Sequence, residues 1–142
     1  MTLHKAEQHE GPMTIQNAAL ALATYTMTEA NKESVVAKRN HWTVGERLVN
    51  AALDIAVHLD MANSMRLDIP SEAEERRRHQ DMALAAIYRL NMLVKIAREL
   101  SNFPSGKHVH WTRLSDDVRA MLYAWKESDR GRRRAAREQK QD

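Results

Sequence analysis

Residues 42–63 of the chain read WTVGERLVNAALDIAVHLDMAN and have the pattern of an amphipathic helix. Thr43 and Glu46 show the Ser/Thr-x-x-Glu spacing of a capping box, in which each side chain accepts a hydrogen bond from the other residue's backbone N–H. The pattern therefore predicts a helix from about residue 44 to residues 63–65. Its apolar side chains step by three and four along one face, which we expect to be buried: Val44, Leu48, Ala51, Ala52, Ile55, Leu59 and Ala62.

The same helical period recurs on the N-terminal side, after the Gly11-Pro12 pair. It predicts a helix over about residues 13–31, with a thin apolar stripe that is rich in alanine. Because isolated helices of this length are marginally stable in water, we expect this one to depend on its neighbours. Its predicted core positions are Ile15, Ala18, Ala19, Leu22, Tyr25 and Thr26.

The longest helix is predicted between Pro70 and about Ser101. Pro70 ends any continuation of the preceding helix, and Ser71 and Glu74 repeat the capping-box spacing directly after it. We expect basic side chains to form solvent-facing stripes on this helix, with Arg78 beside Arg89 and Arg77 near Lys95. The predicted core positions are Ala83, Ala86, Ile87, Leu90, Leu93, Val94, Ala97 and Leu100.

A fourth helix is predicted to begin near Thr112 or Ser115, after a loop over residues 103–110. Asp116 and Asp117 then fall in its first turn, where the helix dipole favours negative charge. The apolar period ends at Ser128. The expected buried face consists of Leu114, Val118, Met121, Leu122 and Trp125.

These four stretches and the composition indicate an all-α protein. Strand alternation is not evident in the sequence, and Ala, Leu, Met, Arg and Glu lose little on entering a helix. Helices joined by short connections are typical of an antiparallel up-down four-helix bundle. We therefore expect a disordered leader over residues 1–12, a bundle over residues 13–129 and a flexible basic tail over residues 130–142.

The charge is distributed unevenly along the chain. The formal net charge is only +3, from 22 Lys and Arg against 19 Asp and Glu. Residues 130–142 hold six basic and two acidic residues, which leaves 16 basic and 17 acidic residues in the first 129. Clustered positive charge attracts polyanions, so the tail suggests an anionic partner.

The basic side chains are the candidate binding residues for nucleic acid or for an acidic patch on a protein. A tail that serves only solubility is the alternative for residues 130–142. The candidates are Lys38, Arg39, Arg77, Arg78, Arg89, Lys95, Arg130, Arg132, Arg133, Arg134, Arg137 and Lys140.

No motif in the sequence points to catalysis, and we expect a protein without enzymatic activity, cofactor or metal. Cysteine is absent, which excludes thiol catalysis and Cys-ligated metals. His108 and His110 lack further ligands at motif spacing, so we interpret them as surface residues of a loop. Asp54 and His58 have the spacing of a surface pair within one helix. Neither a signal peptide nor an apolar span is evident, so we expect a cytoplasmic protein that does not enter a membrane.

The large flexible and aromatic side chains receive structural interpretations. We expect Trp42, Trp111 and Trp125 to pack at the ends and seams of the bundle rather than to stack on bases. Methionines 61, 65, 82, 92 and 121 favour gap filling in the core, with an adaptable docking surface as the alternative.

The segment from Lys38 to Leu48, KRNHWTVGERL, together with the Ala-Leu-Asp of residues 52–54 and the Ala-Asn of residues 62–63, resembles the Avd family. These are the accessory variability proteins of diversity-generating retroelements. Residues 90–100 and the Ala-Trp-Lys-Glu-Ser of residues 124–128 are also similar to that family. The resemblance covers about residues 30–129, and the leader and the tail lie outside it.

The resemblance implies a four-helix bundle that assembles as a pentameric barrel with a positively charged surface. Such proteins bind a reverse transcriptase and its template RNA in support of mutagenic cDNA synthesis. We expect the same partners for this chain, with the cDNA as an additional candidate. The family pattern also implies structural roles for Thr43, Gly45 and Arg47. Two alternatives stay open: a protein-interaction adaptor that binds no nucleic acid, and an accessory bundle of another system that contains a reverse transcriptase.

Overall fold

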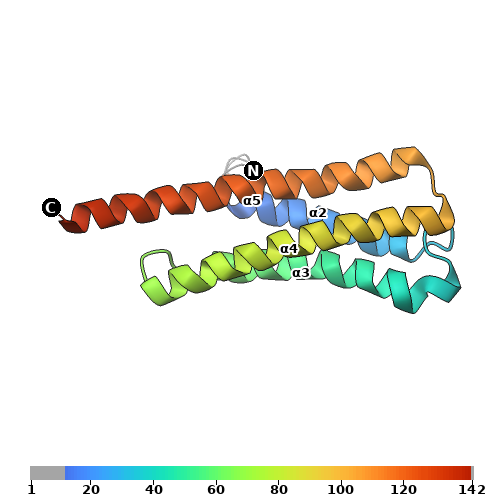
Figure 1. Ribbon diagram of the computed structural model, residues 1–142, viewed down its shortest axis with the longest axis horizontal. Helices are drawn as coiled ribbons and strands as arrows, with labels where there is room; N and C mark the ends of the chain where they lie inside the picture. The colour runs from blue at the N-terminus through green and yellow to red at the C-terminus, as the bar shows by residue number, and fades with distance from the viewer. Residues whose placement is uncertain (1–11, 142) are drawn as a thin grey trace, which may run out of the picture.

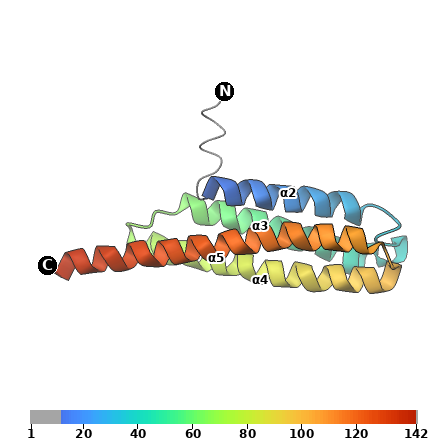
Figure 2. The ribbon, with the colours of Figure 1, turned by 90° about the horizontal axis from the view of Figure 1, so that it is seen from above.

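The computed structural model describes residues 12–141, and within this range the chain is all-helical and contains no strand. Its four α-helices are α2 (Pro12–Ala30), α3 (Glu46–Ser64), α4 (Pro70–Ser101) and α5 (Ser105–Gln141). They lie side by side as a bundle, and the C-terminal part of α5 extends past the end where α3 connects to α4 (Figures 1 and 2). The predicted helical bundle is thus confirmed at this level. None of the described helices combines the length and the apolarity needed to span a membrane.

The core runs along the axis of the bundle and follows the predicted faces closely. All seven positions predicted between Val44 and Ala62 are buried, and α2 contributes Ile15, Ala19 and Leu22. Leu93, Leu114 and Met121 are only partly buried against the core. Leu100 was predicted to be buried and is 52% exposed, because the last turn of α4 lies beside the short connection to α5.

The predicted capping box at the start of α3 is wrong. The chain is already helical before Glu46, as a 3₁₀ turn η1 (Lys38–Asn40) followed by a π-helical turn η2 (His41–Gly45). The Thr43 hydroxyl donates to the Asn40 carbonyl at 3.4 Å, and no side chain caps α3. Because the preceding turns are helical, the first N–H groups of α3 need no side-chain acceptor.

The second predicted capping box, at Ser71, is also wrong. Pro70 is itself the first residue of α4, and Ile69 occupies the cap position without a side-chain hydrogen bond. Proline fits this position because its missing N–H would be unpaired there in any case. Ser71 therefore lies inside the helix, and the Ala73 N–H donates to the Ile69 carbonyl at 2.8 Å.

Helix α5 is longer than predicted at both ends. Asn102 ends α4 in a left-handed conformation, with φ of 55°, and α5 begins three residues later. His108 and His110 consequently lie in a helix and not in a loop. At the other end α5 continues beyond Ser128 to Gln141, through Ala, Arg, Glu and Gln residues that favour helix. The predicted leader falls outside the described residues except for Pro12, which starts α2, and the division of the chain at residue 130 stays a prediction.

Candidate nucleic-acid interface

A groove lined by basic side chains lies between the N-terminal half of α4 and the C-terminal half of α5. We call it the basic groove; its volume is about 220 Å³. Arg77 comes from α4, while four arginines and Lys126 come from α5. The complete lining is Leu67, Ala73, Arg77, Gln80, Lys126, Asp129, Arg130, Arg133, Arg134 and Arg137.

The spacing of the arginines on α5 explains why they share one side of the helix. Arg130, Arg133, Arg134 and Arg137 stand at i, i+3, i+4 and i+7, so they follow a single stripe. At 100° per residue this stripe is centred about 100° around α5 from the buried face that carries Val118, Leu122 and Trp125. The arginines therefore stand beside the buried face, on the side of α5 that lines the basic groove.

Most of the positive charge in the basic groove is not neutralised by neighbours. Lys126 pairs with Asp81 at 2.5 Å, and Arg130 pairs with Glu127 at 2.9 Å. Among the described residues, no carboxylate forms an ion pair with the other four arginines, Arg77, Arg133, Arg134 and Arg137. Guanidinium groups stay protonated and donate in a planar fork that matches phosphate oxygens. The basic groove therefore has the charge and the donors to hold an anion.

A buried ion pair lies at the basic groove, because its acidic member, Asp129, is one of the lining residues. The Arg76 guanidinium donates to the Asp129 carboxylate from Nε at 2.7 Å and from Nη2 at 2.9 Å. Gln80 Nε2 donates to the same carboxylate at 2.9 Å. The side chains of Arg76 and Asp129 are only 9% and 8% exposed. This two-pronged contact fixes the distance and the rotation of α5 relative to α4 at the groove.

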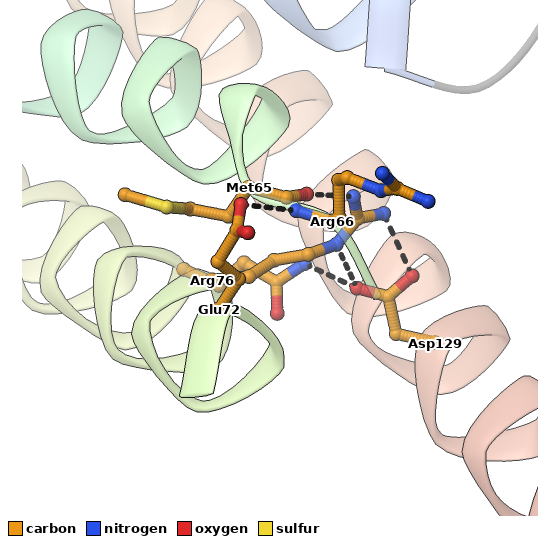
Figure 3. Close-up of polar contacts among 6 residues, drawn as sticks. Met65, Arg66, Glu72, Arg76 and Asp129 are labelled. Atoms are coloured by element: carbon orange, nitrogen blue, oxygen red, sulfur yellow. Dashed lines mark hydrogen bonds and ion pairs between the residues drawn. The ribbon is translucent and has the colours of Figure 1, made fainter. Parts of the chain in front are cut away.

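Arg76 also reaches the connection between α3 and α4 (Figure 3). Its Nη1 donates to the Met65 carbonyl at 3.1 Å, and its guanidinium lies 4.9 Å from the ring centre of Trp125. In the same connection, the Arg66 N–H donates to Glu72 at 3.2 Å. One arginine thus joins the end of α3, the start of α4 and the middle of α5.

Sequence reasoning missed both members of this ion pair, although a signal was present. At 100° per residue, Arg76 lies about 40° from Leu90 around α4, and so on the core face. Asp129 likewise lies about 20° from Leu122 around α5. An arginine and an aspartate that continue two apolar faces indicate a buried pair, because a lone charge is rarely buried.

The structure gathers five of the twelve predicted binding residues in the basic groove: Arg77, Arg130, Arg133, Arg134 and Arg137. Arg132 and Lys140 are exposed elsewhere on α5, and Lys95 is exposed on α4. Arg78 pairs with Glu75 at 2.7 Å, and Arg89 pairs with Asp54 at 2.8 Å. Lys38 and Arg39 form part of η1, between α2 and α3 at the other end of the bundle (Figure 1).

The histidines do not converge on a metal. Within residues 12–141, no group of three or more His, Cys, Asp or Glu side chains is placed to hold one. His110 packs edge-on against Tyr25, with ring centres 4.7 Å apart. The expected surface pair of Asp54 and His58 does not form, because each side chain bonds across to α4: Asp54 to Arg89, and His58 to His79.

The two facing imidazoles form a half-buried contact between α3 and α4. The Nδ1 atoms of His58 and His79 are 2.9 Å apart, so one ring donates and the other accepts. Burial lowers the pKa of His79, and the charges of His58 and Arg78 lower it further. If both facing Nδ1 atoms carried a proton, this hydrogen bond could not form.

The interpretations of the tryptophans and methionines hold only in part. Trp111 and Trp125 are buried, and Trp111 Nε1 donates to Thr26 at 3.0 Å. Trp42 is 73% exposed, so the prediction that it packs the end of the bundle is wrong. The π-helical turn directs Val44 and Gly45 inward in its place. Met61, Met82 and Met92 are exposed instead of filling the core.

Comparisons of this chain with protein-family models, with curated proteins and with solved structures found no match.

Proposed function

We propose that the protein is a non-catalytic, RNA-binding accessory subunit of a diversity-generating retroelement. In this role the basic groove holds the phosphate backbone of template RNA, and a bound reverse transcriptase supplies the chemistry. The observation that carries the binding role is the gathering of five arginines in one groove, four of them outside any described ion pair. The assignment to a retroelement is supported by the resemblance of residues 30–129 to the Avd family.

Phosphate is the anion that this set of donors fits best. Four neighbouring guanidinium groups repel one another, and a polyanion relieves that repulsion along the whole stripe. Arginine can bind phosphate through two parallel hydrogen bonds, which adds geometry to charge. A nucleic-acid strand presents such groups at regular intervals, and the exposed extension of α5 gives it free access.

The proposal extends to assembly. We propose an antiparallel up-down bundle that forms a pentameric ring in the cytoplasm. Each copy has a nearly neutral body and one basic groove, so a ring would present several basic grooves on one assembly. An exposed apolar face supports contact with other proteins. It consists of Leu53, Val57 and Met61 on α3 and of Met82, Met92, Ile96 and Leu100 on α4. The Asp54–Arg89 ion pair links the two helices beside these stripes.

This apolar face also favours a second candidate function, a protein-interaction adaptor that binds no nucleic acid. Exposed apolar patches commonly mark protein interfaces, and methionines adapt to different partners. In the first proposal the same face receives the reverse transcriptase or a second copy of the chain. In the second it is the only functional surface, and the basic groove only keeps the protein soluble.

Binding of single-stranded RNA at several salt concentrations separates the two candidates. We expect log affinity to fall linearly with log salt, with a slope of about 0.7 for each phosphate contact. The double variant Arg133→Ala, Arg137→Ala should reduce the affinity and the slope. The matched control Arg132→Ala, Lys140→Ala removes equal charge from the same helix outside the basic groove, and it should change both less.

The results of these binding measurements decide between the accessory subunit and the adaptor. Equal losses in the two variants would refute a role for the groove, and no measurable RNA binding by the wild-type protein would favour the adaptor. Purification of the protein from cells that carry the neighbouring polymerase tests the accessory role. Recovery of neither RNA nor a reverse transcriptase would refute it.

A further inference from the structure

The lining of the basic groove includes a carboxylate, which is unexpected for a site that binds anions. Asp129 lines the groove and carries a formal negative charge within it. Because like charges repel, this charge alone is expected to weaken phosphate binding. However, the Asp129 carboxylate already accepts three hydrogen bonds of 2.7–2.9 Å from Arg76 and Gln80.

The contacts of Asp129 determine where the arginines of α5 stand. Asp129 lies one residue before Arg130 and one helical turn before Arg133, and its partner Arg76 is adjacent to Arg77 on α4. Because both backbones are helical and rigid over one turn, the Arg76–Asp129 contact sets Arg77 opposite the arginine stripe. Beyond this contact, residues 130–140 are largely exposed and bury no apolar face that could hold α5 in place.

The lining also limits what the groove can recognise. None of the described residues that line it is aromatic, so bases have no surface on which to stack there. From Arg130 to Arg137 the helix rises about 10 Å, which matches two or three consecutive phosphates of one strand. The groove therefore offers contacts to the backbone and none to the bases.

We propose that the basic groove is a preformed, sequence-independent site for consecutive phosphates of one nucleic-acid strand, and that Asp129 is its positioning residue. The proposal rests on the nucleic-acid binding proposed above. It predicts an effect of Asp129 on affinity that is opposite to the effect expected from its charge alone. The negative side chain of Asp129 increases the affinity for a polyanion, because it holds the arginines in register with Arg77.

The test compares two variants that each remove one carboxylate from this region. Asp129→Asn should weaken binding of a single-stranded uridine 12-mer by at least tenfold and lower the salt slope by about one phosphate contact, or about 0.7. The control Asp81→Asn frees Lys126, which also lines the groove, and should leave the affinity unchanged or raise it. A partly unfolded sample binds less RNA at an unchanged slope, so the slope distinguishes positioning from loss of folded protein.

If Asp129→Asn does not fold, a second variant tests the same role of Asp129. Arg76→Lys keeps the charge but loses the planar fork that holds Asp129, so it should also lower the slope. Equal or tighter binding by Asp129→Asn, or by Arg76→Lys in its place, would overturn the role of Asp129 while leaving the proposed function intact. If the wild-type protein does not bind the 12-mer, both the proposed function and this inference fail.

The remaining arms identify the ligand. Adenosine and uridine 12-mers should bind with similar affinity, and a tenfold preference for one of them would overturn sequence independence. A duplex of equal length and inorganic polyphosphate distinguish the sources of phosphate. We expect the single strand to bind at least as tightly as the duplex, and polyphosphate to compete with it. Failure of polyphosphate to compete would show that groups other than phosphate are recognised and would overturn the proposal.

Discussion

Replacement of the Arg76–Asp129 pair by apolar side chains gives a stability prediction whose size follows from burial. Each side chain is less than one-tenth exposed, so Arg76→Met or Asp129→Leu leaves one charge buried without a partner. Such single changes cost about 3–5 kcal/mol. For a chain of this size this corresponds to a fall in Tm of roughly 10–17 °C.

The double variant Arg76→Met, Asp129→Leu should be far less destabilised than the sum of the two. Its side chains fill a similar volume and leave no unpaired charge, so we expect a stability within about 2 kcal/mol of the wild type. The coupling energy between the two sites should then be about 4 kcal/mol or more.

Urea unfolding followed by circular dichroism measures all four proteins of this cycle. The protein concentration is held constant, because any self-association stabilises the folded state by mass action. A single variant that costs less than about 1 kcal/mol, or two single effects that simply add, would refute the view that this buried pair joins α4 to α5.

Three further predictions concern the histidine contact, the core and the C-terminal helix. Burial lowers the pKa of His79 below its ordinary 6.5. Between the two pKa values the unfolded chain therefore binds more protons than the folded chain. The contribution of His79 to the free energy of unfolding is complete above about pH 6.5 and is lost as pH falls through the folded-state pKa. Urea unfolding at several pH values should therefore show a weaker decline for His79→Gln than for the wild type, and equal declines would contradict this. Leu90→Asp should unfold the bundle, whereas Leu100→Asp, at a half-exposed position, should cost less than about 1 kcal/mol by the same assay. Removal of residues 132–142 keeps Asp129 and should preserve thermal stability within a few degrees while weakening RNA binding in a gel-shift titration; a collapse of the Tm would show that the extension itself supports the fold.

Local patterns predicted the buried faces of the helices well, because the spacing of apolar residues within one segment determines which face of its helix is apolar. Every predicted core residue from Val44 to Ala62 is buried. The capping boxes at Thr43 and Ser71 failed for a related reason. Their spacing describes a helix that starts from extended chain, whereas α3 follows helical turns and α4 starts at Pro70.

The site was predictable in composition but not in geometry. The sequence contains the arginines of the tail, yet it does not say that Arg77, 53 residues before Arg130, stands opposite them. In the run Arg76-Arg77-Arg78 the three residues have the same local propensity and three different environments: an ion pair within the bundle, the basic groove, and the solvent-facing pair with Glu75. Only the packing of α5 against α4 separates them.

Gly45 illustrates a prediction from family resemblance that has a steric basis. Its backbone is ordinary right-handed helix, but a Cβ there would lie 3.3 Å from the Val36 side chain. The structural role expected at this position is therefore a close approach of η2 to the loop that follows α2.

The triple contact of Arg76 also bears on the order in which the molecule is made. The ribosome releases Met65 and Arg76 long before Asp129, so the Arg76 guanidinium lacks its carboxylate until the last stage of synthesis of this stretch. Neither the carboxylate nor the arginine stripe of α5 exists before then. A nascent chain that ends before Asp129 therefore has no assembled basic groove, and under the proposed function it would not yet bind RNA.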